Sequence, residues 1–215
     1  MEGDEPPDIE VTLPVSCVLQ LADGTAVTLM GSSYLHETLG QYTYRISAPS
    51  FFQVNTFQAE RLVDYVCAQV SQGVDSVVDA YCGVGTFSLA MASRTRRLVG
   101  IEGSPSSLED ARVNAQGLDH LTFLQGAVED VLPTLDSAPQ LMLLDPPRQG
   151  LDPGVLAALR QSQPERIIYV SCDPATLARD IKELLAGGYL LRSVSPFDMF
   201  PQTYHVETVA VLVRA

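Results

Sequence analysis

Apolar positions between residues 76 and 186 alternate between two spacings, and this alternation predicts the fold. Short runs of consecutive apolar residues, typical of buried strands, are each followed by a stretch with apolar residues three or four positions apart, the spacing of a helix. The predicted strands are 76–80, 98–101, 121–124, 141–144 and 167–170, and the helices that follow them are 87–93, 104–116, 127–135, 153–161 and 174–186. Repeated strand–helix units predict an α/β protein with a mostly parallel, doubly wound sheet.

The segments on either side of this region have other patterns. Before it, residues 56–70 place apolar side chains on one face of a predicted helix, with Asn55 in position to cap it. After it, two β-type runs at 189–196 and 205–213 follow each other with no helix between them. The α/β alternation is therefore broken, and we expect an antiparallel hairpin at one edge of the sheet.

The first part of the chain predicts a small antiparallel β appendage. Its β-type runs at 15–21, 26–30 and 42–46 are separated by turn signals rich in glycine, serine and aspartate. We therefore expect two regions. Residues 1–45 form an acidic N-terminal segment with the appendage, and residues 46–215 form the α/β domain.

Glycines and a carboxylate follow the first two strands of the α/β domain, where such sheets bind ligands. Gly83 and Gly85 allow the backbone to come close to a ligand, and Glu102 ends the next strand, where a carboxylate can bind two ribose hydroxyls. A dinucleotide or S-adenosylmethionine would suit this arrangement. Ser88 stands where the dinucleotide fingerprint has its third glycine, which disfavours a bound pyrophosphate.

Asp145-Pro146-Pro147 follows the fourth strand. The two prolines restrict the backbone, so they hold the Asp145 carboxylate at the same edge of the sheet as Gly83 and Glu102. The residue can hold a cofactor or the polar edge of a substrate. The alternative is that the motif only ends the strand.

Ser171-Cys172-Asp173-Pro174 places a lone thiol where the fifth strand passes into a helix. Asp173 suits the N-cap of that helix and Pro174 its first position. The positive end of the helix would favour the thiolate, so we expect Cys172 to be a nucleophile. The alternative is a small buried apolar residue.

Glu207 lies near the start of the last β-type run, on the same face as Val209, Val211 and Val213. A carboxylate on so apolar a face is costly unless it has partners or a chemical role, although a solvated strand end is the alternative. A nucleophilic thiol, a methyl-donor pocket and a carboxylate base suffice to methylate C5 of a pyrimidine. The thiolate would add to C6, the methyl group would pass to C5, and the base would remove the C5 proton.

Composition restricts the location and the partners. No apolar run approaches the roughly 20 residues of a membrane span, and the acidic start has no signal-peptide pattern, so we expect a cytoplasmic protein without membrane contact. The four cysteines form no CxxC motif, and we expect no metal or iron–sulfur cluster. The net charge of −13 disfavours nucleic acid, but residues 1–44 contain no Lys or Arg, and the acids there account for much of the charge. Composition alone leaves RNA open as a partner.

Five ordered motifs between residue 45 and the C-terminus resemble those of the RNA 5-methyluridine methyltransferases, which include tRNA and 23S rRNA (uracil-5-)-methyltransferases. These motifs are Phe51-Phe52-Gln53-Val54-Asn55, Asp79 to Gly85, Asp145-Pro146-Pro147-Arg148, Ser171-Cys172-Asp173-Pro174 and Phe200 to Glu207. The resemblance implies the class I S-adenosylmethionine methyltransferase fold and an RNA substrate, either tRNA or rRNA. Some members also carry an N-terminal RNA-binding domain and a cysteine cluster, neither of which is found in this sequence.

The resemblance also implies roles for individual residues. Cys172 would be the nucleophile that attacks C6, and Glu207 the base that takes the C5 proton. The S-adenosylmethionine site would be lined by the glycine loop and by side chains from several motifs, with Thr86 at a position that is often Asn. These cofactor residues are Gln53, Tyr81, Gly83, Thr86, Glu102 and Asp145.

Other functions remain open on the residues alone. A module that binds S-adenosylmethionine or a nucleoside without methylating RNA would have a buried Cys172 and a solvated Glu207. A methyltransferase acting on a substrate other than RNA is a further alternative. A nicotinamide-dependent oxidoreductase is disfavoured by Ser88 and by the motif that begins at Asp145.

Overall fold

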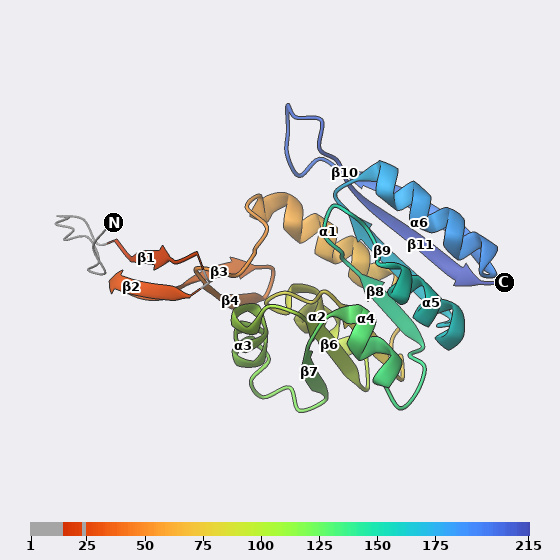
Figure 1. Ribbon diagram of the computed structural model, residues 1–215, viewed down its shortest axis with the longest axis horizontal. Helices are drawn as coiled ribbons and strands as arrows, with labels where there is room; N and C mark the ends of the chain where they lie inside the picture. Colours follow the sequence, from red (N-terminus) through yellow and green to blue (C-terminus); the bar gives the residue numbers. More distant parts are fainter. Residues whose placement is uncertain (1–14, 23–24) are drawn as a thin grey trace.

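The computed structural model describes residues 15–22 and 25–215, with a seven-stranded sheet at its centre (Figure 1). The strand order is β10-β11-β9-β8-β5-β6-β7, in which β5 to β9 run parallel and β11 runs antiparallel to both β9 and β10. The strands of this sheet are β5 (Val77–Ala80), β6 (Leu98–Glu102), β7 (Leu121–Gln125), β8 (Leu141–Leu144), β9 (Arg166–Ser171), β10 (Tyr189–Phe197) and β11 (Glu207–Arg214). The predicted parallel sheet and its antiparallel edge hairpin are confirmed.

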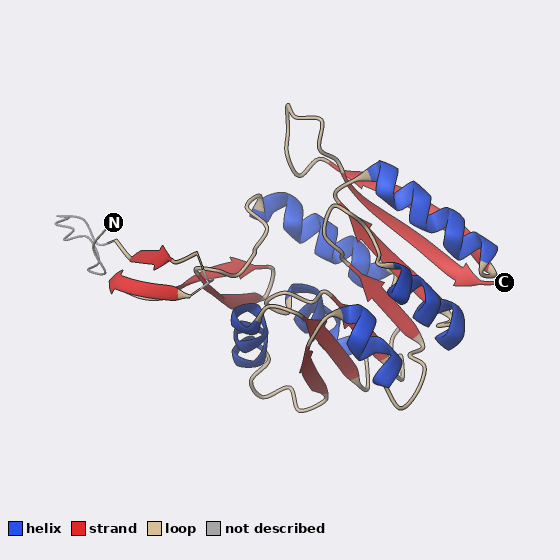
Figure 2. Cartoon of the chain, in the orientation of Figure 1, coloured by secondary structure: helices blue, strands red, loops and turns tan. Residues whose placement is uncertain are grey.

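Helices cover both faces of the sheet and form two apolar cores with it (Figure 2). On one face, residues of α1, α2 and α3 join the core, and on the other face residues of α4, α5 and α6 do so. The helices are α1 (Thr56–Ala68), α2 (Thr86–Met91), α3 (Pro105–Asn114), α4 (Val128–Val131), α5 (Pro153–Ser162) and α6 (Pro174–Ala186), with short 3-10 turns η1 (Ala92–Arg94) and η2 (Leu132–Thr134). Because the sheet is covered on both sides, its parallel strands are mostly apolar.

Side-chain caps fix where the two longest helices begin. The Asn55 side chain accepts a hydrogen bond from the Gln58 N–H at 3.2 Å at the start of α1. At the start of α6, the Asp173 carboxylate accepts from the N–H groups of Ala175 and Thr176, each at 2.9 Å. Both predicted caps are confirmed, and the second one holds Cys172 at the junction between β9 and α6.

Two short antiparallel ribbons precede the α/β region. They are β1 (Cys17–Gln20) with β2 (Ala26–Met30), and β3 (Tyr34–Leu39) with β4 (Tyr42–Ser47). The sequence pattern did not predict β3, because its residues include His36, Glu37 and Thr38 and make no apolar run. The β1–β2 ribbon extends away from the body of the molecule (Figure 2).

The β3–β4 ribbon is anchored on α3 rather than free of the α/β region. The buried Asp110 carboxylate accepts from the N–H and the hydroxyl of Ser47 and pairs with Arg45 at 3.2 Å. Tyr44 and Ile46 are buried in the core shared with α1 and α2. The predicted boundary between residues 45 and 46 falls inside β4, and the acidic stretch predicted at residues 1–10 lies outside the described residues. The division into two domains stays a prediction.

Within residues 15–22 and 25–215, no helix is long and apolar enough to cross a membrane. The same residues include no group of three or more His, Cys, Asp or Glu side chains arranged to hold a metal ion.

Candidate active site

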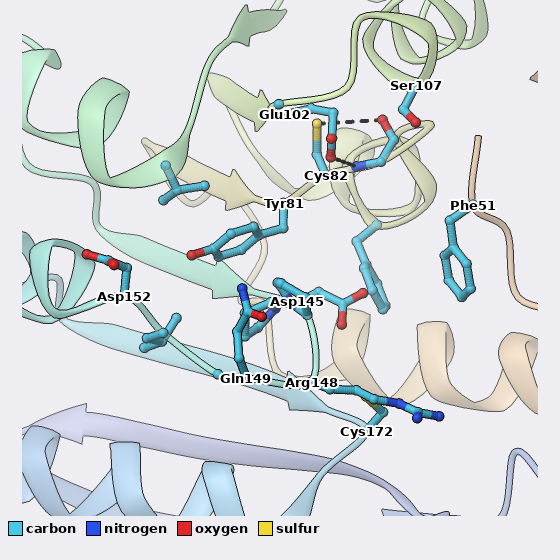
Figure 3. A pocket seen from close by; sticks show the side chains of 18 of the residues that line it. Phe51, Tyr81, Cys82, Glu102, Ser107, Asp145, Arg148, Gln149, Asp152 and Cys172 are labelled. Atoms are coloured by element: carbon cyan, nitrogen blue, oxygen red, sulfur yellow. Dashed lines mark hydrogen bonds between the residues drawn. The ribbon is translucent and has the colours of Figure 1, made fainter. Parts of the chain in front are cut away.

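A cleft of about 1390 Å³ lies at the carboxyl ends of the parallel strands. Single small-molecule pockets measure about 300 to 1,000 Å³, so this cleft is larger than one small ligand requires. Figure 3 shows the cleft with side chains at the carboxyl ends of β5, β6, β8 and β9: Tyr81, Glu102, Asp145 and Cys172. All of the predicted site residues line it: Gln53, Tyr81, Gly83, Thr86, Glu102, Asp145, Cys172 and Glu207.

Glu102 hydrogen-bonds to the backbone of the glycine loop, which joins β5 to α2 and contains Gly83 and Gly85. One Glu102 oxygen accepts from the Gly83 N–H at 2.9 Å and the other from the Ser104 N–H at 2.7 Å. Gly83 (φ 54°) and Gly85 (φ 86°) have left-handed backbone conformations that other residues rarely adopt. Each carboxylate oxygen of Glu102 keeps a lone pair for a further donor, so the site can accept from two hydroxyl groups of a ligand.

Among the described residues, one buried polar side-chain atom that lines the cleft has no hydrogen-bond partner, and one backbone position of the glycine loop is open. The Gln53 side-chain oxygen is buried without a hydrogen-bond partner. At Gly83 a side-chain carbon would meet no atom within 4 Å, so the backbone there is open to the cleft. Buried acceptors are normally satisfied, so the Gln53 oxygen fits a polar ligand that presents a hydrogen-bond donor in this cleft.

Asp79 lies in β5, shortly before the glycine loop, and is fully buried. The Ser88 hydroxyl donates to one of its oxygens at 2.5 Å, and the other oxygen has no partner. Burial is the largest influence on Asp79 and raises its pKa to about 7. The presence of Ser88 at this position disfavours a bound dinucleotide. In the structure, Ser88 hydrogen-bonds to the buried Asp79 beneath the glycine loop.

Tyr81 points away from Glu102, toward Asp152 (Figure 3). Its left-handed backbone (φ 66°) is unusual for a residue other than glycine. Burial raises the pKa of the Tyr81 hydroxyl, and the charges of Glu129 and Asp152 add to that effect. Tyr81 therefore divides the cleft between the Glu102 side and an acidic side that the sequence did not predict.

Cys172 and Glu207 meet at the other end of the cleft. Ser171 and Thr208 are the last backbone pair between β9 and β11, so Cys172 and Glu207 stand just beyond that pair on adjacent strands. Glu207 is only 4% exposed, and burial raises its pKa to about 7. The Cys172 sulfur is half-buried and faces the same cleft.

The prediction that the helix end would favour the Cys172 thiolate is corrected by this environment. Burial raises the pKa of Cys172, and the negative charge of Glu207 raises it further. The Arg148 guanidinium, which lies beside the thiol (Figure 3), acts in the opposite direction and lowers the pKa of Cys172. Desolvation and the neighbouring carboxylate therefore set the direction of the shift, and Arg148 is the side chain that favours the thiolate.

Arg148 is the functional candidate that sequence reasoning did not single out. It follows Asp145-Pro146-Pro147, lies beside Cys172 (Figure 3), and donates to His205 Nε2 at 3.4 Å. The feature of the sequence that could have identified Arg148 is its position directly after the two prolines. Burial raises the pKa of Asp145 well above its usual value, and the charges of Glu207 and Asp79 raise it further.

Comparison with known proteins shows the family to which the chain belongs. The model of the tRNA (Uracil-5-)-methyltransferase family matches residues 17–134 and 134–215. The chain belongs to this family. An uncharacterized RNA methyltransferase of Gloeobacter violaceus is 47% identical over 190 residues, which cover 87% of this chain and 41% of that protein. One of Lactococcus lactis is 43% identical over 191 residues, covering 86% of this chain and 41% of that protein.

Solved structures give the fold of this family member. The tRNA (uracil-54, C5)-methyltransferase of Pyrococcus abyssi, in complex with S-adenosyl-L-homocysteine, matches with a TM-score of 0.75 and 35% identity over 86% of this chain and 45% of that one. A precorrin-6y C5,15-methyltransferase of Geobacter metallireducens matches with a TM-score of 0.61 at 13% identity, covering 73% of this chain and 88% of that one, which supports the fold alone. The chain has the class I S-adenosylmethionine methyltransferase fold and spans about two fifths of the curated relatives' length.

Proposed function

We propose that this chain carries the catalytic site of an S-adenosylmethionine-dependent methyltransferase that acts on C5 of uridine in tRNA or rRNA through a covalent Cys172 adduct. The observation that carries the proposal is the meeting of Cys172 and Glu207 in one cleft with Glu102 and the glycine loop. A thiol and a carboxylate flanking a space for a flat ring, beside a nucleoside site, are the groups that C5 methylation requires.

The cofactor residues would bind S-adenosylmethionine on the Glu102 side of the cleft. The two Glu102 oxygens would accept from the ribose hydroxyls, and the Gly83 backbone leaves room for the ligand. Gln53 and Asp145 would face the reactive end, between the glycine loop and Cys172, and Tyr81 and Thr86 line the remaining wall. When bound, the cofactor supplies an electrophilic methyl group on a sulfonium centre.

Cys172 would open the reaction at the uracil ring. After losing its proton to solvent, the Cys172 thiolate forms a bond to C6, and the electrons of the C5–C6 double bond move toward the C4 carbonyl to give an enolate. C5 then has the electron density to accept a methyl group. The Arg148 guanidinium beside the sulfur stabilises the thiolate before addition.

Glu207 would complete the reaction. Its carboxylate takes the proton from methylated C5, the C5–C6 double bond forms again, and the bond between C6 and the Cys172 sulfur breaks. The thiolate is restored, and the proton rests on Glu207 until it passes to solvent. A buried carboxylate whose pKa lies at about 7 suits this task, because a base is most effective when its pKa is near the working pH.

The test uses RNA tritiated at uracil C5, because methylation at C5 must release that hydrogen as tritiated water. We expect S-adenosylmethionine-dependent release by the wild-type chain and none by Cys172→Ala. Cys17→Ala is the matched control, since Cys17 is also half-exposed but lies on β1, outside the cleft. This variant should release tritium like the wild type.

Two results would reject the proposal: no release from any cellular RNA fraction, or unchanged release by Cys172→Ala. Binding of S-adenosylmethionine without a covalent complex on RNA that contains 5-fluorouracil would instead favour a binding module without catalysis.

A further inference from the structure

The segment that joins β10 to β11, residues 198–206, projects from the body of the molecule as the blue loop of Figure 1. Near its end Tyr204 is 88% exposed, more than any other large apolar side chain among the described residues. A single exposed aromatic ring needs no explanation by itself. Its support and its position relative to the cleft are what make Tyr204 informative.

The loop holds Tyr204 in place through its own hydrogen bonds. Met199 is buried, and the Asn55 side chain at the start of α1 donates to its carbonyl at 3.1 Å. The Thr203 hydroxyl donates to the Phe200 carbonyl at 2.8 Å and accepts from the His205 N–H at 3.2 Å. The exposed ring is therefore presented by an ordered turn, which reduces the entropy lost when a partner binds.

A series of contacts leads from Tyr204 to Arg148, which lies beside Cys172. The Tyr204 and His205 rings lie 4.1 Å apart between centroids, and Phe200 meets the His205 ring edge-on at 6.2 Å. His205 Nε2 accepts from Arg148 at 3.4 Å, and Arg148 lies beside Cys172 (Figure 3). Phe200 and Arg148 both line the cleft, so His205 connects the exposed Tyr204 ring to the cleft lining.

We propose that Tyr204, backed by His205, stacks against an unpaired RNA base next to the uridine that enters the cleft. This inference rests on the proposed function. A uridine must leave its stack to reach Cys172, which leaves the neighbouring base with an uncovered face. Tyr204 offers an aromatic face to that base, and the adjacent His205 and Arg148 belong to the side-chain types on which nucleobases stack.

RNA fits this surface better than another protein does. The ring is continuous with the cleft that the substrate base must enter, and the nearest charged side chain in the chain of contacts is the cation Arg148. The surface formed by Tyr204, His205 and Arg148 lies outside residues 1–44, the segment that contains no Lys or Arg. It thus places an aromatic and a cationic group together in a protein whose overall charge repels RNA.

The test measures binding of a short, unstructured, fluorescein-labelled RNA that contains one uridine. Base stacking on an aromatic side chain is worth enough that Tyr204→Ala should bind about 5- to 150-fold more weakly. Tyr204→Phe keeps the ring and should bind close to the wild type. Tyr34→Ala is the matched control: Tyr34 is 40% exposed and packs edge-on against His36 at 5.3 Å, but it lies on β3 outside the cleft.

A second RNA, with abasic sites beside the uridine, tests stacking itself. Wild-type binding should weaken on this RNA, and Tyr204→Ala should then cause no further loss, because the same contact is already missing. Unchanged binding of the intact RNA by Tyr204→Ala, equal losses on both RNAs, or no binding by the wild type would overturn the inference. Wild-type tritium release accompanied by any of these results rejects the stacking site alone, whereas absent release rejects the proposed function.

Discussion

Glu207 and Cys172 stand side by side just beyond the last backbone pair of two antiparallel strands, Ser171 with Thr208. Burial raises the pKa of both side chains, and the charge of Glu207 raises that of Cys172 further. Two anions in this position disfavour each other, so the resting site favours at most one of them. In the proposed reaction the two groups carry their negative charge at different steps, the thiolate before addition and the carboxylate after methyl transfer.

Replacing Glu207 by Gln should separate these two steps. The thiol pKa should fall toward its usual value because the neighbouring charge is gone, but the C5 proton would have no acceptor. We expect turnover to fall about 10²- to 10⁴-fold, the usual contribution of a general base. A methylated RNA–protein complex that survives denaturing electrophoresis should accumulate.

The double variant Glu207→Gln with Cys172→Ala is the control and should form no such complex. If Glu207→Gln turned over RNA at the wild-type rate without accumulating the complex, Glu207 would not be the base.

The rate should depend on pH through Glu207. Its pKa of about 7 means that the carboxylate is protonated, and inactive as a base, below neutral pH. We therefore expect kcat/KM, measured by tritium release, to rise as pH increases through about 7. The raised pKa of Cys172 predicts a continued increase at alkaline pH. A profile that falls between pH 6 and pH 8 would contradict both assignments.

Arg148 should control the reactivity of the Cys172 thiol. Arg148→Gln removes the cation that lowers the thiol pKa and leaves burial and Glu207, which raise it. Alkylation of Cys172 by iodoacetamide, followed by mass spectrometry in the absence of RNA, should shift to higher pH. Arg96→Gln is the control, because Arg96 is an exposed residue paired with Asp75 at 3.4 Å, and it should not change the profile.

The order of strands and helices could be predicted because it depends on local pattern. Apolar runs, helical spacing and the caps at Asn55 and Asp173 are encoded by residues close together in sequence, and the structure contains them. Strand β3 escaped detection because its order comes from pairing with β4, whose Ser47 binds Asp110 about sixty positions away. A contact of that range leaves no periodic signal in the sequence.

The candidate site was predictable in its members but not in its electrostatics. Ligands bind at the carboxyl ends of parallel strands, so polar residues at those ends were expected to lie together, and they line one cleft. The wrong direction for the Cys172 pKa came from considering only the helix that follows it. Glu207 lies on a strand more than thirty residues later in the chain, and Arg148 lies in the loop after β8. The pKa of Cys172 depends on how burial and these two charges combine, which can be judged only from three-dimensional positions.

The two glycines of the loop after β5 should differ in how much they tolerate a side chain. Both have positive φ, so alanine at either position costs about 1 to 2 kcal/mol in backbone strain. At Gly83 the added carbon meets no atom within 4 Å, whereas at Gly85 it would lie 3.1 Å from a Leu89 methyl and 3.5 Å from the Ala111 side chain. Because α2 and α3 pack closely there, crowding should cost Gly85→Ala about 1 kcal/mol or more in addition. Urea unfolding of the ligand-free chain should therefore give a lower free energy of unfolding for Gly85→Ala than for Gly83→Ala, while equal losses would mean that backbone strain alone decides and that the loop does not pack on α3.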